Sequence, residues 1–451
     1  MGELFGTDGI RGIANQYPMT PEMAVTIGRA VAMFFKGDDG QSKIVIGKDT
    51  RISGEMLEHA LISGICSMGV DVHLTGILPT PGVAFMTSSI GADAGIVISA
   101  SHNPFYDNGI KIFNRKGYKL SDEEENRIEQ LVLNQSIAST STSVRDTGRV
   151  YDIHDAGVAY GNFLKQTVSE NLYVKDMKIV MDCSNGATFE VAPAIFTQLG
   201  AKVTPLSVTP DGKNINNNCG SQHPENLVKS VVKTGAHIGF AFDGDGDRLV
   251  AVDEKGTVVT GDQILAVCAK FMKQKGLLKG NQVVSTVMSN MGLGQALNKM
   301  GIKHMMTAVG DRYVVEKMVS SGAVLGGEDS GHMIFLNHHT TGDGILSALR
   351  LIEAMKEESK PLSELCKIMT IFPQILMNVN VVRKPDLNNI PEIKEAIAWV
   401  ETALGEKGRV LVRYSGTEPI CRVMVEGPTA DITNAYCREL ADVIRKSIGK
   451  H

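Results

Sequence analysis

Three aspartates separated by single glycines, Asp243, Asp245 and Asp247, follow the apolar segment Ile238–Phe242. Carboxylates in such an aspartate cluster repel one another and raise each other's pKa unless a cation lies among them. A hard divalent cation such as Mg²⁺ prefers oxygen ligands, and the glycines allow the tight turn that lets three side chains converge. The pattern therefore predicts a magnesium site at the end of a strand.

The aspartate cluster has two other interpretations, a calcium-binding loop and a solvated acidic turn. Together with Glu254, its spacing matches ligand positions 1, 3, 5 and 12 of a calcium-binding loop. Such a loop requires glycine at its sixth position, where this chain has Arg248, and the residues that follow form a strand-like apolar run. A solvated acidic turn that binds no metal is the remaining alternative.

A candidate nucleophile lies in the string SASHNP at residues 99–104, after a predicted strand that ends near Ile98. A serine hydroxyl there would be exposed at the edge of a sheet. Serine is a weak nucleophile unless a base or a metal ion assists it, and His102, Lys111 and the aspartate cluster are available for this. Because Asn-Pro is also a common turn, a purely structural serine is the alternative.

Three further loops combine groups that bind phosphate or sugar. Residues 413–419 (RYSGTEP) and Arg422 provide guanidinium groups, hydroxyls and a glycine, which can bind a phosphate through side chains and backbone N–H groups. Residues 326–332 (GGEDSGH) offer carboxylates, a hydroxyl and an imidazole, which suit the hydroxyls of a sugar. Near the N-terminus, the string FGTDGIRG places Thr7 and Arg11 among glycines. Taken singly, each string is equally compatible with an ordinary polar loop.

The apolar pattern around these motifs predicts sheets with helices packed on them. Residues 43–47 have a strand pattern, residues 54–69 carry apolar side chains at helical spacing, and residues 70–74 return to a strand. This alternation continues with a helix pattern over residues 187–199 and a strand pattern over residues 323–325, and the polar stretch 134–146 is typical of a linker. The C-terminal part has the texture of a small α+β domain. The predicted domains are residues 1–155, with the FGTDGIRG and SASHNP strings, and residues 156–254, 255–370 and 371–451, with one motif each.

The composition excludes several classes of protein. A chain of 451 residues is too long for one hydrophobic core, so clefts between domains are expected. The formal net charge of -5 gives no basic field for a nucleic-acid or membrane partner. The seven cysteines are scattered without a C-x-x-C pair, and the sequence has neither a signal-peptide pattern nor a long apolar run. These features predict a cytoplasmic protein that acts on a small molecule.

Together the five motifs resemble those of the α-D-phosphohexomutase superfamily, in the same order from residue 4 to about residue 427. The resemblance implies a heart-shaped α/β fold of four domains, with three related mixed α/β domains and a C-terminal α+β domain. It implies that Ser101 carries a phosphoryl group and binds one Mg²⁺ per chain with Asp243, Asp245 and Asp247. The other catalytic candidates are His102 or Lys111 as the general acid/base, and Arg248 and Arg11, which could offset phosphoryl charge. It assigns substrate binding to Glu328, Ser330, His332, Arg413, Ser415, Gly416, Thr417 and Arg422.

The motifs are most similar to the branch of the superfamily that acts on glucosamine phosphate, and the segment 214–225 (NINNNCGSQHPE) shares this similarity. The resemblance implies an isomerase that interconverts glucosamine 6-phosphate and glucosamine 1-phosphate through a phosphoserine and a bisphosphorylated sugar. Its product would supply UDP-N-acetylglucosamine for cell-wall synthesis. A sugar 1,6-bisphosphate would be the activator, and a homodimer is compatible with the resemblance.

The alternatives differ in substrate or in reaction class. Asp329 stands where the glucosamine branch more often has Gln, so a phosphomannomutase or phosphoglucomutase with the same mechanism is the nearest alternative. Phosphatases that use Mg²⁺ and paired aspartates commonly attack with an aspartate, whereas this chain offers a serine. A sugar-phosphate-binding regulator would need neither Ser101 nor the aspartate cluster. The expectation on which the mutase hypothesis depends is that Ser101 lies close to the aspartate cluster.

Overall fold

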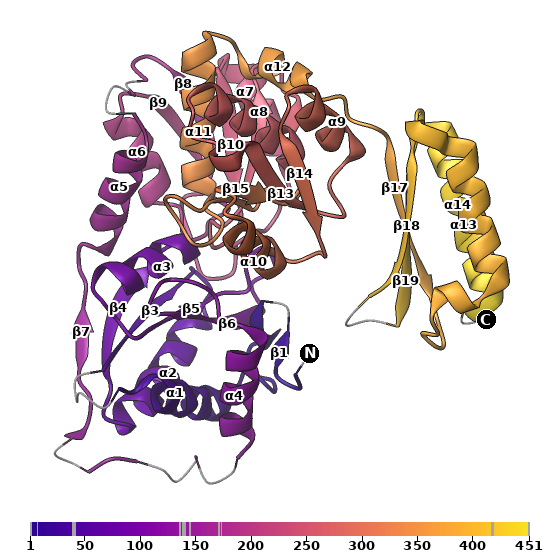
Figure 1. The fold of residues 1–451 in the computed structure, drawn as a ribbon. Coiled ribbons are helices and arrows are strands. Elements are labelled where there is room, and N and C mark those ends of the chain that lie inside the picture. The colour runs from indigo at the N-terminus through magenta and orange to yellow at the C-terminus, as the bar shows by residue number, and fades with distance from the viewer. Residues whose placement is uncertain are drawn as a thin grey trace. The chain divides into compact units, whose positions relative to one another are not determined.

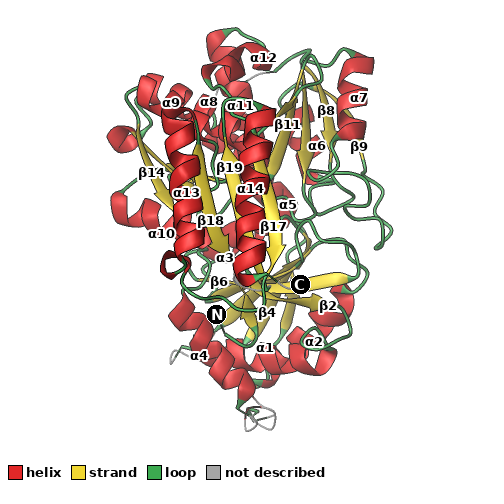
Figure 2. Ribbon diagram, turned by 90° about the vertical axis from the view of Figure 1, so that its right-hand side faces the viewer, coloured by secondary structure: helices red, strands yellow, loops and turns green. Residues whose placement is uncertain are grey.

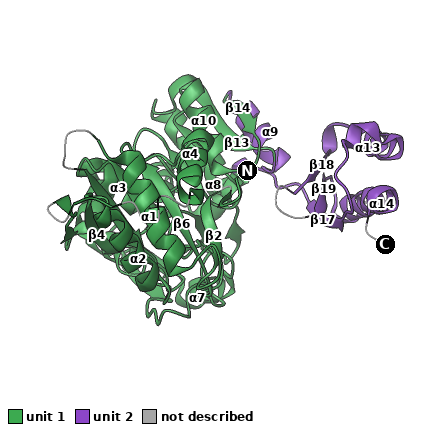
Figure 3. Ribbon diagram, turned by 90° about the horizontal axis from the view of Figure 1, so that it is seen from below, with its two compact units in different colours: residues 1–287, 302–367 green, residues 288–301, 368–451 purple. Residues whose placement is uncertain are grey.

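The computed structural model describes residues 2–6, 8–37, 42–134, 137, 141–143, 146–169, 172, 174–415 and 419–449. The chain divides into two compact units (Figure 3). The first unit consists of residues 1–287 and 302–367, and the second consists of residues 288–301 and 368–451. In the part of the chain that the structure describes, the strands form four sheets, of which three belong to the first unit.

The first sheet has seven strands and begins near the N-terminus (Figure 1). In spatial order the strands are β1 (Phe5–Gly6), β2 (Gly9–Ile13), β6 (Asp107–Asn114), β5 (Ala94–Ile98), β3 (Lys43–Lys48), β4 (Asp71–Ile77) and β7 (Val150–Asp152). Helices α1 (Pro21–Phe35), α2 (Gly54–Ser67) and α4 (Asp122–Leu133) lie on one face of the sheet, and α3 (Thr80–Ser89) lies on the other. Fully buried Ile44, Ile46 and Leu61 belong to the core under α1 and α2.

Two smaller sheets complete the first unit. The second sheet runs β12 (Val258–Val259), β11 (Leu249–Asp253), β10 (Ile238–Phe242), β8 (Lys178–Asp182) and β9 (Lys202–Leu206). The third runs β14 (Lys303–Thr307), β13 (Gln282–Thr286), β15 (Leu325–Gly327) and β16 (Met333–Phe335). The accompanying helices are α5 (Ala156–Thr167), α6 (Val191–Gln198), α7 (Glu225–Thr234), α8 (Gly261–Gln274), α10 (Asp311–Ser321), α11 (Gly344–Glu358) and α12 (Leu362–Leu365).

The three sheets of the first unit share one arrangement of four strands. Their orders are β6-β5-β3-β4, β11-β10-β8-β9 and β16-β15-β13-β14. In each set of four, the first three strands in chain order form two parallel pairs, and the fourth returns antiparallel to the third. The loops after β5, β10 and β15 carry the serine, aspartate and GGEDSGH motifs. This common topology confirms the prediction of three related mixed α/β domains.

The second unit contains a three-stranded antiparallel sheet of β17 (Gln374–Asn380), β19 (Ile420–Glu426) and β18 (Arg409–Tyr414). Helices α13 (Pro391–Leu404) and α14 (Ala430–Ile448) pack on one face of this sheet (Figure 2). Buried Val423, Leu440 and Ile444 belong to the core between sheet and helices. The short helix α9 (Met291–Lys299) also belongs to this unit. The α+β texture predicted for the C-terminal part is therefore present.

Several element boundaries differ from the sequence-based predictions. A helix expected over residues 187–199 begins at Val191, after a turn in which the N–H of Phe189 donates to the carbonyl of Gly186 and the N–H of Ala187 donates to the carbonyl of Gly244 in the aspartate loop. A strand expected over residues 323–325 is β15, which extends through Gly327. The predicted linker over residues 134–146 lies largely outside the described residues. Among the helices that are described, none has the length and apolarity that a bilayer span requires.

Candidate active site

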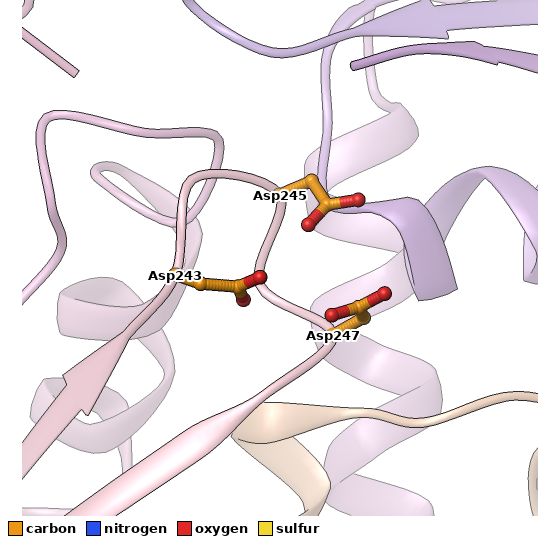
Figure 4. Close-up of side chains that lie close together, drawn as sticks. All are labelled: Asp243, Asp245 and Asp247. Carbon is orange, nitrogen blue, oxygen red and sulfur yellow. The ribbon is translucent and has the colours of Figure 1, made fainter. Parts of the chain in front are cut away.

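The aspartate cluster lies in the loop that joins β10 to β11. All three side chains are buried, and their carboxylate ligand atoms lie within 4.8 Å of one another. Figure 4 shows them directed to the same side of the loop. Gly246 has a φ of 71°, which favours glycine, and a Cβ at this position would collide with Thr188. The glycine therefore permits the convergence that the sequence predicts.

Cations of the protein itself offset the charge of the aspartate cluster only in part. Lys111 Nζ donates to Asp245 Oδ2 at 2.7 Å and to Asp247 Oδ2 at 3.3 Å, and Arg248 Nε lies 3.8 Å from Asp247 Oδ1. Burial and the other two carboxylates hold the pKa of Asp243 well above its ordinary value. Burial opposes ionisation of Asp247, but Lys111 holds its pKa well below the ordinary value. Among the described residues, Asp245 Oδ1 and Asp247 Oδ1 are buried without a hydrogen-bond partner.

Ser101 lies directly against the aspartate cluster. Its Oγ donates to Asp243 Oδ2 at 2.5 Å, and its N–H donates to Ser99 Oγ at 2.9 Å. Its φ of 54° lies in the left-handed region, which serine rarely adopts, so surrounding contacts must hold the residue there. A Cβ on Gly244 would lie only 2.5 Å from the Ser101 carbonyl oxygen. The structure thus brings together the serine and the carboxylates on which the mutase hypothesis depends.

Both sequence candidates for proton transfer flank this contact. His102 Nδ1 lies 3.4 Å from Ser101 Oγ. Burial and Arg248 lower the pKa of His102 to about 4, so its imidazole is neutral at pH 7. Burial disfavours the ammonium of Lys111, but Asp245 raises its pKa well above the ordinary value, so Lys111 stays charged. The site therefore contains a neutral proton acceptor and a charged proton donor.

A network of ion pairs that the sequence analysis did not single out extends the site. Asp8 pairs with Arg11 and Lys119, and its Oδ2 lies 3.3 Å from Lys111 Nζ. Lys119 Nζ in turn lies 2.5 Å from Asp311 Oδ2. Asp8 stands three residues before Arg11 in the FGTDGIRG string, a spacing that could have indicated the pair. Lys119 and Asp311 stand in no motif, and only the fold brings them together.

The loop between β15 and β16 brings two of its three predicted sugar ligands towards the site. His332 Nδ1 lies 3.7 Å from Asp247 Oδ2. Burial disfavours the charged imidazole, but Asp247 raises the pKa of His332 above its ordinary value. Glu328 Oε1 accepts a hydrogen bond from the N–H of Gly310 at 3.2 Å. Ser330 is exposed.

Asp329, which departs from the residue expected in the glucosamine branch, contacts the start of helix α8. Its Oδ1 accepts from the N–H of Asp262 at 3.0 Å, and its carbonyl accepts from the N–H of Gly261 at 3.2 Å. A carboxylate is favoured at a helix N-terminus by the exposed N–H groups and the helix dipole. In this chain the carboxylate of Asp329 therefore stabilises a helix end.

In the second unit, Arg413 on β18 and Arg422 on β19 stand directly opposite each other in the strand register. Burial and the charge of Arg422 lower the pKa of Arg413. Like charges in this arrangement are unfavourable, and an anion such as phosphate would relieve the repulsion. Ser415 follows β18, and its N–H donates to the carbonyl of Ile420 at 2.9 Å. Four residues of the predicted motifs lie outside the described residues: Thr7, Gly416, Thr417 and Glu418.

Family models match successive parts of the chain. The models of phosphoglucomutase/phosphomannomutase α/β/α domains I, II and III match residues 2–138, 159–256 and 260–372, and the model of the C-terminal domain matches residues 376–443. The phosphoglucosamine mutase of Syntrophus aciditrophicus (strain SB) is 59% identical over 449 residues, which cover 100% of this chain and 100% of the relative. The chain is therefore related to this mutase over its whole length.

Solved structures share the fold. A phosphoglucomutase/phosphomannomutase family protein from Burkholderia thailandensis has a TM-score of 0.81 at 25% identity, covering 98% of this chain and 99% of that chain. The N-acetylphosphoglucosamine mutase of Aspergillus fumigatus, solved with GlcNAc-6P and magnesium, has a TM-score of 0.64 at 15% identity, covering 98% and 96%. The resemblance inferred from the motifs is supported by these relatives and by the three equivalent sheets: the chain belongs to the phosphoglucomutase/phosphomannomutase family.

Proposed function

We propose that the protein is a mutase that interconverts glucosamine 6-phosphate and glucosamine 1-phosphate. The reaction type rests on one observation: the 2.5 Å hydrogen bond from Ser101 Oγ to Asp243 Oδ2 places a nucleophilic hydroxyl on a buried carboxylate cluster. The full-length identity of 59% to the Syntrophus phosphoglucosamine mutase supports glucosamine phosphate as the substrate. The proposed setting is the cytoplasm, where the product would supply UDP-N-acetylglucosamine.

The aspartate cluster suits Mg²⁺ as the proposed cofactor. Burying carboxylate oxygens without partners is unfavourable, and Asp245 Oδ1 and Asp247 Oδ1 are such oxygens in the described part of the chain. The three aspartates and the phosphorylated Ser101 would supply the oxygen ligands that this ion prefers. When bound, Mg²⁺ would neutralise charge on the transferring phosphoryl group.

The proposed reaction proceeds in two transfers. In the first, the bond from phosphorus to Ser101 Oγ breaks as a bond to the sugar hydroxyl oxygen forms. The hydroxyl proton would pass to the neutral His102, and the charged Lys111 would supply a proton to the released Ser101 Oγ. The bisphosphorylated sugar then turns over and returns its other phosphate to Ser101. Arg11 and Arg248 would offset charge on the phosphoryl oxygens. A sugar 1,6-bisphosphate would phosphorylate a free Ser101, which explains its proposed role as activator.

Substrate binding is proposed for two loops. Glu328, Ser330 and His332 would form hydrogen bonds with sugar hydroxyls, which both donate and accept. Arg413 and Arg422 would bind the phosphate that is not reacting, because two guanidinium groups match the geometry of phosphate oxygens. The hydroxyl and backbone groups of the predicted loop would add to these contacts through Ser415, Gly416 and Thr417.

Coupled assays with three substrates test the proposed specificity. The purified protein, with Mg²⁺ and a small amount of a sugar 1,6-bisphosphate, is given glucosamine 6-phosphate, mannose 1-phosphate or glucose 1-phosphate. We expect the highest kcat/KM with glucosamine 6-phosphate. A higher value with either of the other sugars would support the phosphomannomutase or phosphoglucomutase alternative. Net release of inorganic phosphate would indicate a phosphatase.

Replacing the proposed phosphate carrier tests the mechanism. We expect Ser101→Ala to reduce mutase turnover by about 10⁴-fold or more, as removal of a covalent nucleophile does in other enzymes. Ser88→Ala, at an exposed position at the end of α3, is the matched control and should behave as the unmodified protein. Intact-mass measurement should show an added phosphate that maps to Ser101. Unimpaired turnover of Ser101→Ala would move the carrier to another residue.

A further inference from the structure

Asn216 contacts the serine loop from the domain that also carries the aspartate cluster. The residue belongs to the polar segment 214–225, whose only sequence signal was its similarity to the glucosamine branch. Asn216 Nδ2 donates to the carbonyl of Ser101 at 2.9 Å and to the carbonyl of Asn103 at 3.0 Å. Asn216 is buried, and its own N–H donates to the carbonyl of Ser184 at 2.9 Å. The side chain therefore joins two loops that come from different sheets.

The same two carbonyl oxygens also accept hydrogen bonds from Arg51. Its guanidinium NH2 donates to Ser101 O at 3.0 Å and to Asn103 O at 2.7 Å, and its Nε donates to Asp49 Oδ2 at 2.9 Å. Arg51 belongs to the first sheet domain, as does the serine loop, whereas Asn216 belongs to the second. Each oxygen thus accepts one hydrogen bond from its own domain and one from the domain of the aspartate cluster.

We propose that Asn216 is a positioning residue, which fixes the backbone at Ser101 so that the serine Oγ stays on the aspartate cluster. The left-handed φ of 54° at Ser101 is unfavourable for serine and needs support from outside the loop. If the peptide that follows Ser101 rotated, the side chain would leave Asp243. This inference rests on the proposed function, because it concerns the group that would carry the phosphate.

The chemistry of asparagine suits this position in two ways. Its amide nitrogen carries two N–H donors, one for each carbonyl, whereas an aspartate would turn a carboxylate oxygen towards two carbonyl oxygens. Its backbone φ of 57° is one that asparagine tolerates better than most residues. Asn216→Asp therefore keeps the shape and removes both donors, and Asn216→Ala removes the side chain without adding charge. Asn217→Asp is the matched control, because Asn217 is exposed and adjacent.

Hydrogen–deuterium exchange of the full-length protein measures positioning without any reaction. Peptides that cover residues 99–107 should exchange faster in Asn216→Asp and Asn216→Ala than in the unmodified protein or in Asn217→Asp. Peptides from the C-terminal sheet serve as an internal reference and should exchange at unchanged rates, which separates a local effect from general unfolding. Unchanged exchange over residues 99–107 in both Asn216 variants would overturn the proposal.

Steady-state kinetics with glucosamine 6-phosphate measure the consequence. We expect Asn216→Asp to lower kcat by about 10²-fold, the effect of misplacing a reacting group by about 1 Å, while KM changes less than about threefold. Asn217→Asp should keep both constants within about twofold. Faster exchange over residues 99–107 with unchanged kcat would also overturn the proposal. If the unmodified protein turns over none of the three sugar phosphates, the proposed function fails, while the exchange measurement still decides the positioning.

Discussion

Two charged clusters in different parts of the chain are built in opposite ways. The aspartate cluster is fully buried, and Lys111, also buried, forms hydrogen bonds with two of its carboxylates. The guanidinium pair Arg413 and Arg422 is half-buried on the C-terminal sheet, and each residue faces the like charge of the other across the strands. The first cluster is organised by buried groups around it, whereas the second keeps two positive charges side by side at partly exposed positions.

The difference shows how burial decides what a charged cluster can do. Moving a charge into or out of a buried site is costly, so a buried cluster must be organised before any ligand arrives. A half-buried pair loses less hydration when an anion binds or leaves. The aspartate cluster therefore suits a resident cation, and the arginine pair suits a phosphate that arrives and departs with each substrate molecule.

Asp245→Asn tests the role of the buried aspartate cluster and is expected to have the largest effect of the substitutions discussed. Asp245 accepts hydrogen bonds from Lys111 at 2.7 Å and from Thr80 at 2.5 Å, so the amide would disturb both and weaken the cation site. Loss of metal-assisted charge stabilisation is worth several kcal/mol, which predicts a fall in kcat of about 10³-fold. The measurement is kcat against Mg²⁺ concentration. Asp176→Asn, an exposed aspartate, is the control, and normal turnover of Asp245→Asn in EDTA would contradict the metal site.

Arg413→Ala tests whether the half-buried arginine pair binds phosphate. Losing charge-assisted hydrogen bonds to phosphate, about 1.5–3 kcal/mol, predicts a fall in kcat/KM of about 10- to 100-fold, mostly through a higher KM. Thermal stability should not fall, because the substitution removes a like-charge contact. Arg413→Lys should be intermediate, since lysine keeps the charge but not the two-pronged geometry. Arg438→Ala, exposed on α14, is the control, and an unchanged KM for Arg413→Ala would mean that this residue binds no phosphate.

The parts of the site that could be predicted are those that occupy short strings. In the aspartate loop, the residue types, the glycines and the preceding apolar strand stand together in the sequence, so Asp243 and Gly246 could be read as one feature. The same holds for Ser101 after β5. The relationship of the three sheet domains could also be predicted, because each domain shows the same alternation of strand and helix patterns in the sequence.

The parts of the site that could not be predicted from the sequence are contacts between residues far apart in the chain. Lys119 and Asp311 pair across 192 positions, and Asn216 reaches Ser101 across 115 positions, so no local pattern marks either contact. The late start of helix α6 has a similar cause. The N–H of Ala187 donates to the carbonyl of Gly244, so the turn before the helix contacts a loop 57 positions away, which no local pattern marks.

Glu129, a buried carboxylate outside both clusters, shows a third way to hold a buried charge, and its replacement is expected to have the smallest effect on turnover. Glu129 on α4 accepts from the N–H groups of Leu4 at 2.8 Å, Phe5 at 3.1 Å and Glu3 at 2.8 Å, so three backbone donors hold its carboxylate. Burial opposes its ionisation, but these donors, with Leu4 first, hold its pKa below the ordinary 4.5. Such a charge needs neither a metal nor a lysine, and Glu129→Gln should leave kcat unchanged.

The stability of Glu129→Gln should depend on pH in a defined direction. Because the pKa of Glu129 is lower in the folded state, its contribution is complete above the unfolded value and is lost as pH falls through the folded value. We expect the substitution to destabilise the protein by about 1–3 kcal/mol at pH 7, since one carboxylate oxygen becomes a donor facing backbone N–H groups. Thermal unfolding is measured at pH 7 and at decreasing pH below 4.5. The difference in Tm between the unmodified protein and Glu129→Gln should become smaller as the pH falls. Glu123→Gln, exposed on the same helix, is the control, and a gap that stays constant with pH would show that the Glu129 charge does not hold the N-terminal strand in place.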